Sequence, residues 1–269
     1  MAIITISRGS FSKGKEVAEK VARRLGYRTV SRQVILEASK DFKVSQAKLD
    51  RAIHDAPSIF DRFTCEKKKY IAYVAAKVLD HFKDDNVVYH GLAGHFFAKN
   101  VSHLCKVRIM ANMKDRIVLL MEKDHHLSRE KAIHFLEKDD KERKTWSHQL
   151  YGVDTSDLAL YDLTIQINKL TVDNAVDLIC ETVAQPQFKA TPESQRRIEN
   201  LALAARVRAA LLDDYSSCEV SAEGESVEIT VLFSAYTDTM IAEIIKKKVL
   251  KIPGVSSVAV NLLPSILFR

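Results

Sequence analysis

The first 25 residues constrain the fold of this chain most strongly. Residues 2 to 7 (AIITIS) form a short run rich in β-branched side chains, which is typical of a buried strand. Val17, Val21 and Leu25 then recur at a spacing of four, as on one face of a helix. The segment between them, residues 9 to 16 (GSFSKGKE), therefore joins a strand to the start of a helix.

The remainder of the first 184 residues repeats this alternation. Further short apolar runs occur at residues 86 to 89, 104 to 110 and 161 to 167, and helical periodicity separates them. We expect helices over residues 113 to 122 and 129 to 137, followed by a separate charge-dense segment. Alternating strands and helices predict an α/β fold, with a parallel sheet covered by helices on both faces.

The composition changes at residues 184 to 192 (AQPQFKATP), where two prolines and several polar residues interrupt the periodicity. We therefore predict a first domain over residues 1 to 184, a linker over 185 to 193 and a second domain over 194 to 269. The second domain shows the order helix, strand, strand, helix, strand, which predicts a small α+β unit.

The segment after the first strand has the spacing Gly-x-x-x-x-Gly-Lys of a phosphate-binding loop. Such a loop turns backbone N–H groups and the positive end of a helix toward phosphate oxygens, and its lysine reaches the terminal phosphates. The alternative is an ordinary turn with a surface lysine. The candidate phosphate-binding residues are Gly9, Ser12, Lys13, Gly14, Lys15 and Glu16.

Glu16 departs from the full motif, because Ser or Thr normally stands there and helps to hold Mg²⁺. A metal would then be held by phosphates, water and other carboxylates, so no metal-ligating residue is predicted. The four cysteines include no Cys-x-x-Cys pair, which favours reduced thiols over a zinc site or a disulfide framework.

The net charge of +6 is unevenly distributed, with +7 on residues 1 to 189 and −1 on the rest. A basic first part is compatible with nucleic-acid binding, but an excess this small is more typical of a solvated basic surface. No apolar run approaches the ~18 residues that a membrane helix needs. We expect a cytoplasmic protein.

Several short motifs together resemble the cytidylate kinase-like family of P-loop nucleoside monophosphate kinases across residues 1 to 184. They are Ser7-Arg8, Gly14-Lys15-Glu16, Leu25-Gly26-Tyr27 with Ser31-Arg32, Asp140-x-x-Arg143, and Tyr161-Asp162-Leu163. The resemblance implies a kinase core with a P-loop for ATP, use of Mg²⁺, a helical acceptor-binding region and a short lid. It also implies transfer of the ATP γ-phosphate to a nucleotide, with CMP or dCMP as the acceptor.

By this resemblance, Lys15 and Arg143 are the candidate catalytic residues. Arg32, Arg116, Asp140 and Arg143 match positions that bind the acceptor: the arginines grip phosphate through their planar guanidinium groups, and Asp140 contacts the base. The alternative for Arg116, Asp140 and Arg143 is a set of solvated helix charges.

Two further positions depart from the family pattern. Leu92 and Leu136 stand where classical members carry arginine, and phosphoryl transfer depends on such cations. His90 and His95 could compensate by donating to phosphate, although packed histidines are the usual case. The rival hypothesis is therefore a catalytically weak or inactive nucleotide-binding sensor, coupled to the second domain.

The second domain resembles a BON domain over residues 194 to 264, chiefly in its ending Ile252-Pro253-Gly254-Val255-x-x-Val258. This resemblance implies attachment to phospholipid or another ligand. Lys246, Lys247, Lys248 and Lys251 would face lipid headgroups or an acidic protein partner, unless they simply complement a helix dipole. The sequence is also compatible with a homo-oligomer.

Overall fold

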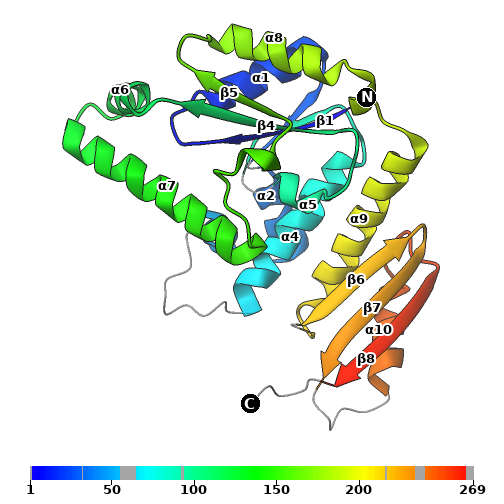
Figure 1. Cartoon of the computed structure of the whole chain (residues 1–269). Coiled ribbons are helices and arrows are strands. Elements are labelled where there is room, and N and C mark those ends of the chain that lie inside the picture. The colour runs from blue at the N-terminus through cyan, green and yellow to red at the C-terminus, as the bar shows by residue number, and fades with distance from the viewer. Residues whose placement is uncertain are drawn as a thin grey trace.

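The computed structural model describes residues 2–31, 33–54, 65–91, 94–215, 217–233 and 240–264. Its larger sheet has five strands, all parallel, in the order β2-β3-β1-β4-β5 (Figure 1). The strands are β1 (Ile3–Arg8), β2 (Arg28–Val30), β3 (Val87–Tyr89), β4 (Leu104–Ala111) and β5 (Leu163–Ile167). This sheet confirms the predicted α/β class.

The chain leaves β1 toward one edge of the sheet and later returns to the other side of β1 with β4. The strand order therefore reverses at the carboxyl end of β1, which is where ligands bind in open α/β sheets. The segment of residues 9 to 13 follows β1 at this point, directly before α1 (Gly14–Leu25). A local sequence signal is thus placed where the topology favours a ligand site.

Helices cover both faces of this sheet, as Figure 1 shows for α1 and α8 on one side and α4 and α5 on the other. On the first face, Ile4 and Ile6 of β1 share a core with Val17 and Val21 of α1. The opposite core includes Ile3 of β1. The other helices around the sheet are α2 (Gln33–Asp41), α3 (Gln46–His54), α4 (Cys65–Phe82), α5 (Gly94–Phe97) and α8 (Val172–Val183).

A two-helix arm follows β4, and it differs from the sequence prediction. We expected a helix ending near Glu137, but α7 runs without a break over Arg129–Tyr151, a length of 23 residues. Nothing within it breaks a helix, because it contains neither Gly nor Pro, and it ends at Gly152 with φ 68°. The arm of α6 (Met113–Lys123) and α7 stands where the family resemblance implied a short lid.

The smaller sheet has three strands in the order β6-β7-β8, antiparallel between β6 and β7 and parallel between β7 and β8. The predicted helix, strand, strand, helix, strand order is confirmed. Short 3₁₀ turns, η1 and η2, precede β5 and α9. The elements are η1 (Leu158–Leu160), η2 (Pro186–Phe188), α9 (Pro192–Leu211), β6 (Cys218–Glu223), β7 (Ser226–Phe233), α10 (Met240–Val249) and β8 (Ser257–Pro264).

Helix α9 contributes to two hydrophobic cores, one against the large sheet and one under the small sheet. Ile198 and Ala202 are buried in the core that α4 forms against the large sheet, whereas Val207 and Leu211 are buried under the small sheet. Just beyond the end of α9, Asp213 Oδ1 accepts a hydrogen bond from the Tyr73 hydroxyl of α4 at 3.0 Å. The two sheets are therefore joined through one helix.

A buried histidine fixes the start of α9 against the large sheet. His103 precedes β4 and is fully buried. Its Nδ1 lies 2.8 Å from Ser194 Oγ of α9, and its Nε2 lies 2.9 Å from Oδ1 of the buried Asp85.

Within the described ranges, no helix is both long and apolar enough to cross a membrane.

Candidate phosphate-binding site

The loop between β1 and α1 is closed by its own side chains. Ser12 is buried, and its Oγ donates to the Gly9 carbonyl oxygen at 2.8 Å. Phe11 (φ 57°) and Lys13 (φ 61°) adopt left-handed backbone conformations. A Cβ at Gly14 would lie only 2.7 Å from Cβ and Cδ of Arg8, so only glycine fits where the Arg8 side chain crosses the helix start.

The N–H groups in the first turn of α1 have no partners within the helix, as at every helix start. Together with the helix dipole, they favour an anion at this point. The segment between β1 and α1 therefore joins the carboxyl end of a central strand to the positive end of a helix, and its binding of phosphate stays a prediction.

Arg116 connects this loop to the two-helix arm. It lies in the first turn of α6 and is 7% exposed. Its Nε donates to the Ser10 carbonyl oxygen at 2.8 Å, and its two terminal nitrogens donate to the two carboxylate oxygens of Asp140 at 2.7 and 2.8 Å. Asp140 thus holds Arg116 in a bidentate pair beside the loop.

Arg143 contacts the same loop from α7. Its Nε donates to Asp139 Oδ2 at 2.7 Å, and its terminal nitrogens donate to Ser10 Oγ at 3.2 Å and to the Arg8 carbonyl oxygen at 3.4 Å. Ser10 Oγ in turn donates to Asp139 Oδ2 at 2.5 Å. The structure therefore brings Arg116, Asp140 and Arg143 together at the loop.

Asp139 and Ser10 complete this cluster, although neither was predicted from the sequence. The spacing of four between Asp139 and Arg143 on one helix was the available signal. That spacing did not lead to a prediction for Asp139, because the neighbouring Asp140 matched the family pattern.

Lys15 and Glu16 form ion pairs along the surface of α1. Lys15 Nζ lies 3.6 Å from Glu19 Oε1, and the Lys15 side chain is 65% exposed. Glu16 Oε1 lies 3.4 Å from Nζ of Lys20, which also pairs with Asp173 at the start of α8. The charge on Lys15 is thus partly compensated by a neighbouring carboxylate.

Two of the sequence-based sites, Arg32 and Leu92, fall outside the described residues. Leu136 is fully buried and packs in the interior of the two-helix arm with Ile117 and Leu120. A leucine stands at this position because the side chain faces α6. Trp146, near the end of the arm, is buried as well and packs with Phe96.

His90 follows β3 beside the loop. It is 6% exposed, and its Nδ1 has no hydrogen-bond partner within the described residues. Burial, followed by the charges of Arg8 and Lys15, lowers the pKa of His90 to about 4. Burial likewise lowers the pKa of His95 to about 4, with Lys106 and Arg108 adding to the effect. Both rings are therefore neutral at pH 7.

The arrangement is chemically suited to bind a phosphate group, because a helix start, two guanidinium groups and a neutral imidazole surround one loop. Both guanidinium groups are already paired with carboxylates. An incoming phosphate must therefore compete with Asp139 and Asp140. Over the described part of the chain, no group of three or more His, Cys, Asp or Glu side chains is arranged to hold a metal ion.

Comparisons with known proteins concern the first part of the chain. Residues 3–169 match the model of the cytidylate kinase-like family. A cytidylate kinase of Methanosarcina acetivorans is 27% identical over 103 residues, which cover 38% of this chain but only 57% of that enzyme. A cytidylate kinase of Sulfolobus acidocaldarius is 24% identical over 183 residues, which cover 68% of this chain and 94% of that enzyme.

Among solved structures, an uncharacterized protein from Eubacterium ventriosum superimposes with a TM-score of 0.53 at 19% identity. The superposition covers 69% of this chain and 99% of that one, and at this identity it supports the fold alone. The family match ends before α9, so the likeness of residues 194 to 264 to a BON domain stays a prediction. Because the family match takes in well over half of the chain and every strand of the large sheet, the protein belongs to the cytidylate kinase-like family.

Proposed function

We propose that this protein transfers the γ-phosphoryl group of ATP to a nucleoside monophosphate, with CMP or dCMP as the acceptor. One observation carries the proposal. Arg116 from α6 and Arg143 from α7 converge on the loop that precedes α1, at the point where the strand order reverses. Two guanidinium groups beside a helix start form a site for polyphosphate rather than for a neutral ligand.

The roles of the residues follow from their positions. The amides of the loop, from Gly9 to Glu16, and the side chain of Lys15 would hold the phosphates of ATP. Arg143 would then move from Asp139 to the transferring phosphoryl group. Asp140 would contact an acceptor base through the lone pairs that its pair with Arg116 leaves open, because each of its oxygens accepts one hydrogen bond from that guanidinium group and the side chain is 40% exposed.

In this reaction an oxygen of the acceptor phosphate attacks the γ-phosphorus, the bond to the β–γ bridging oxygen breaks, and ADP leaves. The protein contributes by positioning the two nucleotides and by neutralising charge on the transferred group. Mg²⁺ would supply further neutralisation of the phosphates. Asp139, whose Oδ2 lies 2.5 Å from Ser10 Oγ of the loop, is a carboxylate suited to hold it, directly or through water.

A nucleotide-binding sensor is the second candidate, and a specific observation favours it. Arg116, Arg143 and Lys15 are each paired with a carboxylate, so the positive charge of these three side chains is partly compensated. Such a site would bind ATP while stabilising a transition state poorly. The kinase and the sensor are both expected to bind ATP, but only the kinase is expected to transfer its γ-phosphoryl group to an acceptor.

A coupled assay of ADP release separates them, using ATP and Mg²⁺ with CMP, dCMP, UMP, AMP and GMP in turn. We expect turnover that depends on the acceptor and that falls at least about 100-fold in Lys15→Ala, because removing one charge contact to the transition state costs a few kcal/mol. Lys141→Ala removes a lysine from the exposed side of α7 and serves as the matched control.

The sensor is supported instead if no acceptor gives turnover while calorimetry detects ATP binding that Lys15→Ala weakens. Absence of both turnover and ATP binding rules out both candidates. Asp139→Asn gives an independent check in the absence of Mg²⁺, since releasing Arg143 from its carboxylate should tighten the binding of metal-free ATP if the arginine contacts phosphate.

We propose that residues 194 to 269 form a BON-like interaction module. Of the four lysines in question, Lys246 pairs with Glu243 and Lys248 with Asp214, whereas Lys247 and Lys251 are exposed and form no ion pair with a described residue. These two lysines would contact lipid headgroups or an acidic partner. Co-flotation with vesicles containing phosphatidylglycerol, lost in Lys247→Glu/Lys251→Glu, is the expected result; equal flotation of the variant would refute this contact.

A further inference from the structure

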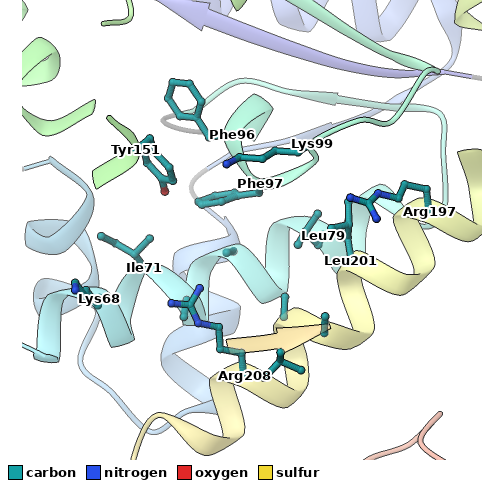
Figure 2. A pocket seen from close by; sticks show the side chains of 15 residues that line it. Lys68, Ile71, Leu79, Phe96, Phe97, Lys99, Tyr151, Arg197, Leu201 and Arg208 are labelled. Carbon is teal, nitrogen blue, oxygen red and sulfur yellow. The ribbon is translucent and has the colours of Figure 1, made fainter. Parts of the chain in front are cut away.

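A pocket of about 690 Å³ lies between α4 and α9, and none of the residues of the phosphate-binding loop lines it (Figure 2). We call it the α4–α9 pocket. Its other walls come from Phe96 and Phe97 of α5, from Lys99 just after that helix, from Tyr151 at the end of α7 and from Val220 of β6. The volume is within the range of small-molecule sites, which is roughly 300 to 1,000 Å³.

Small side chains on the two facing helices explain why the pocket is open. Four alanines line it, two from each helix: Ala72, Ala75, Ala204 and Ala205. Alanine at facing positions leaves space that Leu or Ile would fill in a close-packed interior. Leu79 and Leu201 extend the same apolar floor.

An aromatic wall lies opposite this floor. Tyr151 stacks on Phe96 with ring centroids 4.7 Å apart and contacts Phe97 edge to face at 6.1 Å. The Tyr151 hydroxyl oxygen is buried and has no hydrogen-bond partner within the described part of the chain. Figure 2 shows this hydroxyl turned toward the side of the pocket where Ile71 and Phe97 lie. A buried hydroxyl without a partner costs free energy that a ligand acceptor would recover.

The charged side chains of the lining are all cationic. They are Lys68, Lys99, Arg197 and Arg208, and no Asp or Glu is among the lining residues. Lys99, Arg197 and Arg208 form no ion pair with any described carboxylate. Neighbouring cations on the same helices do form such pairs: Lys69 with Asp213, and Arg206 with Asp80. The pocket therefore combines an apolar interior with uncompensated positive charge.

We propose that the α4–α9 pocket binds a small organic anion with a flat aromatic body. The ring would lie between the alanine floor and the Phe97–Tyr151 wall, and the anionic group would contact Arg197, Arg208 or Lys99. Such a ligand would touch α4 and α9 together and would stabilise the contact between the two cores. The proposal does not depend on the kinase reaction, because the site shares no residue with the phosphate-binding loop.

Two fluorescent probes with the same ring system test the proposal. The first is 1-anilinonaphthalene-8-sulfonate, which is anionic, and the second is N-phenyl-1-naphthylamine, which lacks the sulfonate. Trp146 is the single tryptophan, and its ring lies 5.6 Å from that of Tyr151, so a probe bound in this pocket must accept energy from Trp146. We expect one sulfonate probe per chain, bound at least about tenfold more tightly than the neutral probe.

Matched variants locate the site. Arg197→Gln/Arg208→Gln should weaken the sulfonate probe at least about tenfold and change the neutral probe less than about twofold. Lys189→Gln/Arg196→Gln removes the same charge from residues outside the pocket and should leave both probes unchanged. Ala205→Leu fills the pocket and should abolish binding of both, with an unchanged circular dichroism spectrum showing that the variant is folded.

Equal affinity for the two probes would overturn the anion site. So would sulfonate binding that survives Arg197→Gln/Arg208→Gln, or binding without energy transfer from Trp146. Saturation at several probes per chain would likewise refute a single built pocket.

Discussion

At the scale of single residues, the buried ionisable side chains differ in whether they have a partner. The guanidinium group of Arg116 is held by two carboxylate oxygens and a carbonyl oxygen. His90 Nδ1 and His95 Nε2 have no hydrogen-bond partner in the described structure. The first kind of group stabilises the fold while it is charged. The second kind stabilises it only while it is neutral.

The two histidines predict a pH dependence of stability. Burial lowers the pKa of both to about 4, compared with about 6.5 in an unfolded chain, so below pH 6.5 the unfolded chain binds more protons. Their contribution is complete above pH 6.5 and is lost as the pH falls toward 4. We expect the free energy of unfolding to decrease by about 1 to 2 kcal/mol per histidine between pH 7 and pH 5.

Urea denaturation at the two pH values measures this change. His90→Gln/His95→Gln should show the smaller decrease, whereas the exposed pair His125→Gln/His126→Gln should behave like the unaltered chain. An identical pH dependence in all three proteins would contradict the assignment.

Residue spacing could locate only the local part of the candidate site, whereas Arg116, Asp140 and Arg143 were selected through the family resemblance. The loop from Gly9 to Glu16 adjoins its strand and helix in the chain, so spacing alone located it. The contacts from Arg116 and Arg143 depend on how α6 and α7 fold back over the loop, which no local pattern encodes. For the same reason, the pairing of Asp140 with Arg116, which occupies both carboxylate oxygens, was not foreseen.

At the scale of elements, the contacts that α7 makes change along its length. Its first half packs on α6 through Ala132 and Leu136, its middle carries the carboxylates at the loop, and its end contributes Trp146 and Tyr151 to an aromatic cluster. Charge density suggested a break near residue 138, but a charged stretch without Gly or Pro remains helical when its neighbours are anchored. The arm is therefore a packed structural element.

The packing of Leu136 predicts what restoring the family arginine would do. Leu136→Arg would bury a guanidinium group in the interior of the arm, and we expect the free energy of unfolding to fall by at least about 3 kcal/mol. The exposed neighbour His134→Arg should change it by less than about 0.5 kcal/mol. Chemical denaturation compares the two, and a stable Leu136→Arg variant with raised phosphotransferase activity would show that the arm opens as a lid.

At the scale of the whole molecule, the two sheets depend on each other through α9. The order of elements in the smaller unit could be predicted, because each element carries its own periodicity. The sharing of α9 could not, since apolar residues that face two different cores read along the sequence as one apolar surface. Only the fold shows that Ile198 and Val207 are buried in different places.

The buried contact at the start of α9 makes this dependence testable. His103→Ala would leave the buried carboxylate of Asp85 and the Ser194 hydroxyl without their common partner, and we expect the free energy of unfolding to fall by about 2 to 4 kcal/mol. Urea denaturation measures the loss, and the exposed His148→Ala on α7 is the control. A loss below about 0.5 kcal/mol would mean that this contact does not hold α9 in place.

The shared helix also sets where the chain can be divided. The match to the kinase-like family ends at residue 169, yet Ile198 and Ala202 complete the core against α4. A shorter chain ending at residue 184 would leave that apolar surface of α4 open to water and prone to self-association. We therefore expect the smallest cooperative folding unit of this protein to extend beyond the family match and to include α9.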